Sequence, residues 1–102
     1  EGYLMVFPRA EWEKFRDRVA QLPSEAQWYK RIFLGNAMDG EVDGTGRVLV
    51  SPELRKAVGI TRDATMLGMN THLELWDTAT YEAKEAAALQ AGMPEAIKGF
   101  IF

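Results

Sequence analysis

Residues 42–52 read Val-Asp-Gly-Thr-Gly-Arg-Val-Leu-Val-Ser-Pro, and the rest of the chain is organised around this stretch. Gly44 and Gly46 permit the positive φ angles of a tight turn. The Val-Leu-Val run that follows is rich in β-branched residues, which favour strands. The stretch therefore predicts a hairpin whose two strands are residues 38–42 and 48–50.

A short helix is predicted directly after the hairpin. Ser51 offers a hydroxyl that can cap a helix, and Pro52 fits the first helical position, where a missing N–H costs little. Gly59 then supplies the left-handed residue that commonly ends a helix. We therefore expect strand, turn, strand and capped helix in close succession.

Composition limits the class of protein. The chain has 102 residues, of which 47% are apolar, so we expect a single globular domain. It contains no cysteine, which excludes disulfides and thiolate metal sites. No apolar run approaches the roughly 20 residues of a membrane span, so the sequence predicts a soluble protein with no membrane partner. A net charge of −3 argues against attraction of nucleic acid by the whole surface.

The spacing of apolar residues predicts the remaining elements. They are strands at residues 3–7, 64–69 and 72–76, and helices at residues 9–22, 24–36 and 78–91. Asp77 is placed to cap the last of these helices, because it directly precedes the helical pattern. The final residues, 100–102, are all apolar and are expected to dock on the rest of the molecule.

Two parts of the chain are versions of each other. Residues 3–12 align with residues 72–81, so that each copy has an apolar strand with an aromatic at its end, then a helix-start residue and an aromatic in the first helical turn. The second copy follows the hairpin and short helix of residues 39–59. The first copy would need an equivalent block upstream of residue 1. We interpret the chain as the C-terminal part of a two-repeat protein.

Three segments then occur together in a fixed order. They are Asp-Gly-Thr-Gly-Arg-Val-Leu-Val-Ser-Pro-Glu-Leu-Arg-Lys-Ala-Val-Gly-Ile at residues 43–60, Met-Leu-Gly at residues 66–68, and Leu-Glu-Leu-Trp-Asp at residues 73–77. In this order and spacing they resemble the second repeat of the MraZ family, bacterial transcriptional regulators with two SpoVT-AbrB domains. Residues 12–13 and 31–37 resemble the linker helices of the same family, so the likeness covers nearly the whole chain.

The resemblance implies an α+β fold of the SpoVT-AbrB swapped-hairpin, or double-split β-α-β, type. Such a fold has a small sheet or barrel with a helical hairpin, intertwined with a second copy. The implied parts are the last strand of a truncated first repeat (residues 1–8), a helical hairpin (9–37), a second repeat (38–81), and a C-terminal helix and tail (82–102).

The resemblance also implies a function. It implies a sequence-specific repressor of the division and cell-wall gene cluster that binds double-stranded DNA at repeated short G-rich boxes. It also implies assembly into rings of eight or more subunits. For this chain the resemblance implies a homo-oligomer in the cytoplasm, associated with the nucleoid, without a small-molecule ligand.

Five residues are candidates for DNA contact. They are Asp43, Arg47, Arg55, Lys56 and Arg62, of which the first two match the Asp-x-x-x-Arg motif of the family. Arg47 suits the O6/N7 acceptor pair of guanine, worth about 1–3 kcal/mol of discrimination, with Asp43 as its positioner. The other three basic residues would contact phosphates. In a simpler interpretation, Asp43 and Arg47 form only a surface ion pair, worth about 0–1 kcal/mol.

Two other functional classes can be compared with DNA binding. An enzyme is not expected, because one histidine, no cysteine and no Gly-x-Ser-x-Gly motif leave nucleophilic and zinc catalysis without their groups. No cofactor and no metal site are predicted. The stronger alternative is a protein-binding or oligomerisation module of the antitoxin-like swapped-hairpin type, whose helices at residues 9–22 and 24–36 hold a partner. Salt distinguishes the two, since phosphate contacts weaken as salt rises and apolar contacts through Trp12 and Trp28 do not.

Overall fold

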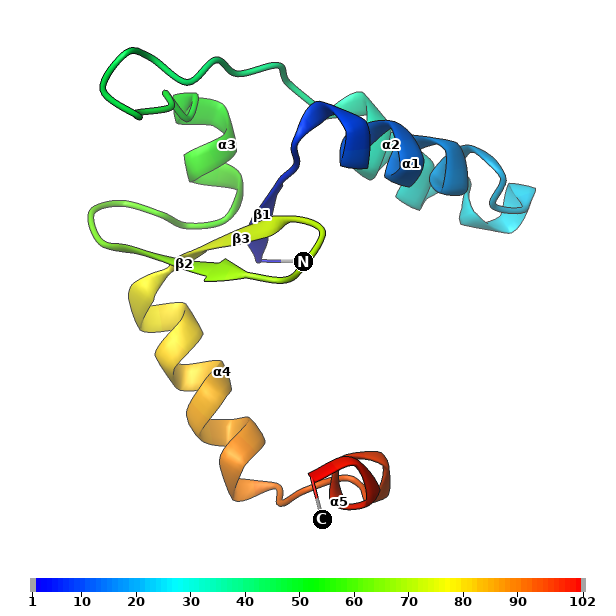
Figure 1. The fold of residues 1–102 in the computed structure, drawn as a ribbon, viewed down its shortest axis with the longest axis vertical. Coiled ribbons are helices and arrows are strands. Elements are labelled where there is room, and N and C mark those ends of the chain that lie inside the picture. The colour runs from blue at the N-terminus through cyan, green and yellow to red at the C-terminus, as the bar shows by residue number, and fades with distance from the viewer. Residues whose placement is uncertain (1, 102) are drawn as a thin grey trace.

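The computed structural model describes residues 2–101, which form a three-stranded sheet with helices around it (Figure 1). In chain order the elements are β1 (Tyr3–Val6), α1 (Arg9–Ala20), the 3₁₀ turn η1 (Ser24–Ala26), α2 (Gln27–Gly35), α3 (Pro52–Ala57), β2 (Ala64–Gly68), β3 (Leu73–Asp77), α4 (Thr78–Gln90) and α5 (Glu95–Ile101). The chain is therefore of the α+β class that the sequence predicts.

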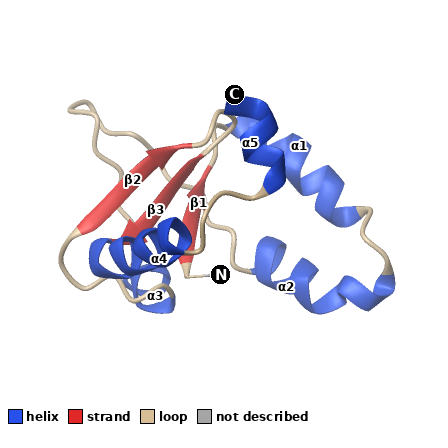
Figure 2. Ribbon diagram, turned by 90° about the horizontal axis from the view of Figure 1, so that it is seen from below, coloured by secondary structure: helices blue, strands red, loops and turns tan. Residues whose placement is uncertain are grey.

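The sheet is antiparallel, with β3 in the middle of the order β1-β3-β2 (Figure 2). β2 and β3 form a tight hairpin, in which the N–H of Met69 donates to the carbonyl of His72 at 2.8 Å. Asn70 takes a φ of 70° in this turn, a left-handed conformation that asparagine tolerates better than most residues. β1 pairs with the other edge of β3, so segments far apart in sequence lie side by side.

In the register of β1 on β3, the two segments that the repeat alignment matches lie in symmetric positions. Met5 lies opposite Glu74, and the alignment of residues 3–12 with residues 72–81 also matches these two residues with each other. A pair that maps onto itself marks a local two-fold axis between the repeats. The two copies therefore meet about an axis that passes through the middle of the β1–β3 pair.

Aromatic contacts on either side of this axis repeat each other. Tyr3 stacks on Trp76, with ring centroids 4.7 Å apart. The repeat alignment converts this pair into Phe7 and His72, whose rings stack at 5.1 Å. Stacked rings stabilise a sheet beyond the area they bury. The symmetry thus extends from the backbone register to the side chains that hold the two strands together.

The helices that follow the two strands obey the same relation. The last aromatic before α1, Phe7, contacts Trp12 at 5.9 Å, and the last aromatic before α4, Trp76, contacts Tyr81 at 5.6 Å. In each repeat the aromatic of the first helical turn therefore closes over the end of the strand. This contact sets the direction in which each helix leaves the sheet.

Helices α1 and α2 form the helical hairpin expected from the two amphipathic segments (Figure 1). Phe15 of α1 meets Phe33 of α2 edge to face at 5.6 Å. Val19, with 5% of its surface exposed, is the only buried apolar side chain among the described residues. The core of a single copy is therefore thin, and much apolar surface stays in contact with water.

Predicted helix caps are confirmed at two positions. The hydroxyl of Ser51 accepts the N–H of Leu54 at 3.3 Å at the start of α3, and the carboxylate of Asp77 accepts the N–H of Thr80 at 3.1 Å at the start of α4. Each side chain satisfies a backbone donor that the first helical turn leaves without a partner. The end of α3 is as predicted too, since Gly59 has a φ of 73°.

The prediction of hairpin strands at residues 38–42 and 48–50 is wrong. Neither segment forms a strand; both run as extended loop on either side of the turn (Figure 1). One backbone pair closes the turn, where the N–H of Asp43 donates to the carbonyl of Arg47 at 2.9 Å. A strand needs a neighbour for its other N–H and C=O groups, and no described segment takes that place. The turn was predicted correctly and its flanking strands were not.

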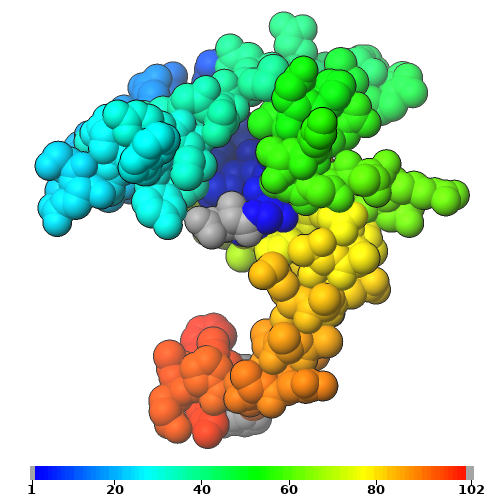
Figure 3. Space-filling model, turned by 180° about the vertical axis from the view of Figure 1, so that it is seen from behind, coloured from blue at the N-terminus to red at the C-terminus, as the bar shows by residue number. Residues whose placement is uncertain are grey.

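Helices α4 and α5 form an arm that stands clear of the other helices (Figures 1 and 3). The prediction that the apolar tail docks is wrong for Phe100, which is 86% exposed. Residue 102 and the side chain of residue 101 lie outside the described part. Among the described helices, none has the length and the apolar character needed to cross a membrane.

Candidate functional site

The turn between Asp43 and Arg47 is a closed local unit. Oδ1 of Asp43 accepts the N–H of Thr45 at 2.9 Å, the N–H of Arg47 at 2.8 Å and the hydroxyl of Thr45 at 2.8 Å. The carbonyl of Asp43 accepts the N–H of Gly46 at 3.1 Å. Gly46 has a φ of 83°, a conformation that costs glycine little and other residues more. One carboxylate therefore fixes the backbone of the whole turn.

These donors change the acidity of Asp43. Its pKa is lowered from the ordinary value of 3.8, chiefly by the hydrogen bond from the backbone N–H of Arg47 and next by the hydroxyl and N–H of Thr45. Hydrogen bonds donated to a carboxylate favour its ionised form. At neutral pH the side chain is therefore a charged acceptor that holds the turn and has no proton to give.

Arg47 is held at one nitrogen of its guanidinium group. Nε donates to the hydroxyl of Thr45 at 2.9 Å and lies 3.5 Å from Oδ2 of Asp43. The side chain is nevertheless 80% exposed. Its two terminal nitrogens form no hydrogen bond with the described residues, so they face solvent. A guanidinium edge presented in this way can donate two parallel hydrogen bonds to an acceptor pair on a partner.

Thr45 is the residue of this turn that the sequence analysis missed. It accepts from Arg47 and donates to Asp43 through the same hydroxyl. The only signal in the sequence is its place between the two glycines of the turn, where its side chain has no alternative partner nearby. Thr45 therefore belongs to the candidate site as the link between its acid and its base.

The other three candidates lie after the turn. Arg55 and Lys56 are on α3 and Arg62 is in the bend between α3 and β2, and all three are exposed. Figure 1 shows the turn segment, α3 and the following bend on one side of the molecule, away from α1 and α2. No hydrogen bond or ion pair between described residues joins these three side chains to the turn. The structure thus places the five candidates on one side without assembling them into a single cluster.

The charge of this side is nearly balanced. From residue 43 to residue 63 the chain carries four basic and three acidic side chains. One copy therefore attracts a polyanion only weakly, since non-specific binding depends on the phosphates neutralised. Any tight interaction with a polyanion requires either a specific contact of Arg47 or several copies acting together.

The side chains that could ligate a metal ion are spread over the described part of the chain. No group of three or more His, Asp or Glu side chains that could hold a metal ion occurs there. His72 is part-buried, 15% exposed, with Nδ1 3.0 Å from the hydroxyl of Thr71 and Nε2 4.0 Å from a carboxylate oxygen of Glu74. It packs on Phe7 and so belongs to the sheet, not to a ligand set.

Comparison with known proteins decides the family. A family model described as "MraZ protein, putative antitoxin-like" matches residues 33–97, more than half of the chain. The chain belongs to the MraZ family. This confirms the resemblance inferred from residues 43–60, and the matched range contains all five candidate residues.

Individual MraZ relatives share most of the sequence. The chain is 72% identical over 102 residues to the transcriptional regulator MraZ of Acidovorax sp. strain JS42, covering the whole of this chain and 72% of that protein. It is 68% identical over 101 residues to the transcriptional regulator MraZ of Variovorax paradoxus strain S110, covering 99% of this chain and 71% of that protein. The corresponding protein of Paraburkholderia phytofirmans strain PsJN is 63% identical over 102 residues, with 100% and 72% covered. No solved structure gives a significant match.

Proposed function

We propose that this chain regulates transcription by binding double-stranded DNA through the turn at Asp43 and Arg47. Membership of the MraZ family and the name of its relatives, transcriptional regulators, support a regulatory role. The observation that carries the DNA contact is the exposed guanidinium of Arg47, fixed at Nε and open at both terminal nitrogens. The target is a guanine edge, and the outcome is repression.

The contacts divide into specific and general ones. Two parallel hydrogen bonds from Arg47 to O6 and N7 of guanine read sequence, which fits repeated short G-rich boxes. Arg55, Lys56 and Arg62 contact phosphates, which sets position on the duplex without reading sequence. The boxes lie upstream of the division and cell-wall gene cluster, and the protein acts in the cytoplasm on the nucleoid.

Assembly into a ring of eight or more copies belongs to the same proposal. The extended segments around the turn support it, because Val42 is 68% and Leu49 is 88% exposed although both suit a buried strand. Intertwining with the hairpin of a second copy supplies the missing strand neighbour. A ring repeats the nearly neutral patch at fixed intervals, so several boxes bind together with high effective concentration. This explains how an acidic chain binds DNA.

The test is a titration of a fluorescent duplex that carries repeated G-rich boxes against the same duplex with scrambled boxes. Arg47→Ala is expected to weaken binding about 5–150-fold, the equivalent of about 1–3 kcal/mol. It should also abolish the preference for the boxes. Arg47→Lys keeps the charge but loses the paired donors, so it restores general affinity and not the preference.

A matched control separates the turn from charge alone. Arg16→Ala removes an exposed arginine of α1, on the other side of the molecule, and is expected to leave the preference unchanged. Lys56→Ala should weaken binding to both duplexes equally and reduce the slope of log K against log salt by about one. An intact melting curve together with unchanged DNA affinity in Arg47→Ala would remove Arg47 from the site.

A second candidate function is a protein-binding module of the antitoxin-like type. The observation in its favour is the apolar surface of α2, where Trp28 is 72%, Tyr29 51% and Ile32 48% exposed. A partner held there resists salt, whereas DNA bound through phosphates is released by it. Retention of a captured protein partner at 1 M salt, with no measurable DNA binding at 50 mM salt, would favour this alternative.

A further inference from the structure

The arm formed by α4 and α5 carries apolar side chains that are exposed to solvent. Ile97 and Phe100 lie three residues apart on α5, so they fall on one face of that helix, and Met93 lies in the segment that joins α4 to α5. They are 40%, 86% and 47% exposed. A helix as short as α5 is marginal alone in water, so this face needs a surface to pack against.

Helix α4 does not provide that surface. In the first repeat, Phe15 and Val19 of α1 and Leu22, just after the end of α1, line the groove beside the partner helix. The repeat alignment puts Lys84 and two alanines at the corresponding positions of the second repeat. Without the large apolar side chains, α4 cannot form the helical hairpin with α5 that α1 forms with α2. This accounts for the open arm in Figure 3.

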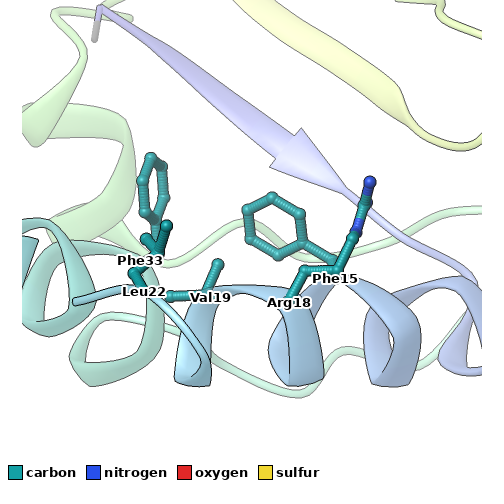
Figure 4. Close-up of a pocket in the computed structure, with 5 residues that line it drawn as sticks. All are labelled: Phe15, Arg18, Val19, Leu22 and Phe33. Atoms are coloured by element: carbon teal, nitrogen blue, oxygen red, sulfur yellow. The ribbon is translucent and has the colours of Figure 1, made fainter.

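The helical hairpin offers a surface of the kind that α5 lacks. A shallow groove of about 240 Å³ lies between α1 and α2, lined by Phe15, Arg18, Val19, Leu22 and Phe33. Figure 4 shows Phe15, Val19 and Phe33 pointing to the same side of the pair. A third helix laid on this side would complete a three-helix bundle, with Phe100 as its largest anchor.

Charge favours the same match. Residues 9–35 carry six basic and four acidic side chains, whereas residues 78–100 carry two basic and three acidic ones. Arg18 lies over the ring of Phe15 at 5.9 Å, at the edge of the groove. An acidic arm therefore approaches a basic hairpin, which steers two copies towards each other.

We propose that α5 of one copy docks in the groove between α1 and α2 of a second copy. The inference rests on the self-assembly included in the proposed function and assigns a surface to it. The contact is head to tail, since the arm and the groove are different surfaces. Each copy then offers one arm and accepts one, and a closed ring leaves neither exposed.

The first test is the mass of the full chain in solution by light scattering. Ile97→Glu puts a charge into the docked face and is expected to lower the mass at least twofold. Gly99→Glu is the matched control: it adds the same charge two residues further on, on the opposite face, where a Cβ meets no other atom. It is expected to leave the mass unchanged. An unsubstituted chain that runs as an 11.5 kDa monomer, or an Ile97→Glu variant of unchanged mass, would overturn the proposal.

A second test separates docking on another copy from docking within one chain. The chain has no cysteine, so Arg18→Cys in one chain and Ala96→Cys in another introduce a single thiol each. Oxidation of the mixture is expected to give a disulfide between the two chains, and neither variant alone should dimerise efficiently. If instead the double variant closes a disulfide within one chain and the mixture forms none, the occupant of the groove is the chain's own arm.

The DNA titration tells a failure of this inference from a failure of the proposed function. Arg47→Ala is expected to keep the mass and lose DNA preference, because the turn is not part of the docked surfaces. Ile97→Glu is expected to lose mass while keeping the turn. If Ile97→Glu lowers the mass and Arg47→Ala binds DNA normally, the docking surface stands and the DNA site falls. If the mass is unchanged in Ile97→Glu and the DNA preference is lost in Arg47→Ala, the DNA site stands and the docking surface falls.

Discussion

Asp43 holds Arg47 through the backbone more closely than through charge. Oδ1 of Asp43 lies 2.8 Å from the backbone nitrogen of Arg47, whereas the nearest approach of the two charged groups, Nε to Oδ2, is 3.5 Å. Exposed ion pairs of this kind contribute little to stability. The acid of the motif therefore shapes the turn, and the guanidinium remains available for a partner.

Two substitutions of Asp43 separate the effect of its hydrogen-bond acceptor on the turn from the effect of its charge. Asp43→Asn keeps an oxygen that accepts the same N–H groups, so it is expected to retain the turn and most of the DNA affinity. Asp43→Ala removes the acceptor and is expected to lose both. The measurement is hydrogen exchange of the Thr45 and Arg47 amides, with DNA titration beside it. Equal protection of these amides in both variants would contradict the role given to the carboxylate.

The turn should also respond to pH in a defined direction. Because the pKa of Asp43 is lowered in the folded turn, its stabilising effect is complete above the ordinary value of 3.8. It is lost as pH falls through the lower, folded value. We expect protection of the Arg47 amide to hold from pH 7 to about pH 4 and to fall below that. Thr45→Val removes one donor to the carboxylate and should move the loss to higher pH, as followed by NMR titration of Asp43.

Alanine substitutions at the two glycines of the turn are expected to have different effects on its stability. Gly46 has a φ of 83°, so Gly46→Ala is expected to raise the free energy of the closed turn by about 1 kcal/mol. Gly44 has no positive φ and nothing near its Cβ position, so Gly44→Ala is expected to be neutral or slightly stabilising. Amide exchange at the turn measures both. Equal effects at the two positions would show that the turn has another conformation in solution.

The stacked rings across β1 and β3 should be energetically coupled. A double-mutant cycle with Tyr3→Ala and Trp76→Ala is expected to give a coupling of about 0.5–1.5 kcal/mol in urea unfolding. The control cycle combines Tyr29→Ala with Trp76→Ala. Tyr29 lies on α2 and stacks on Phe33, so this cycle should give a coupling below about 0.5 kcal/mol. A coupling near zero in the first cycle would mean that the two rings do not stack in solution.

Local chemistry explains what could be predicted from the sequence. Caps such as Ser51 and Asp77 act on donors within three residues, so they can be predicted from the adjacent sequence. The repeat was equally visible, because it requires only that residues 3–12 and 72–81 resemble each other. Their pairing about Met5 and Glu74 was not predicted, because it depends on how two segments far apart in the sequence meet in space.

The errors concern segments whose structure depends on something distant. Residues 48–50 have the composition of a strand, but a strand exists only where another strand supplies hydrogen bonds. The apolar tail has the composition of a docked segment, yet Phe100 is 86% exposed. At the candidate site, the turn between Asp43 and Arg47 was predictable from its glycines. The role of Thr45 was not predictable, because threonine is common in turns without any role in binding.

The pairing of β1 with β3 has a consequence for the order in which the chain folds. The β2–β3 hairpin and the α1–α2 pair join neighbouring segments and can form within microseconds. Met5 and Glu74, in contrast, are separated by about 70 residues, and closing so long a loop is entropically costly before any contact rewards it. We expect β1 to join last, after β3 has been synthesised. Until then the newly made chain exposes an unpaired strand edge, so this step governs how much of it aggregates and how much reaches the native fold.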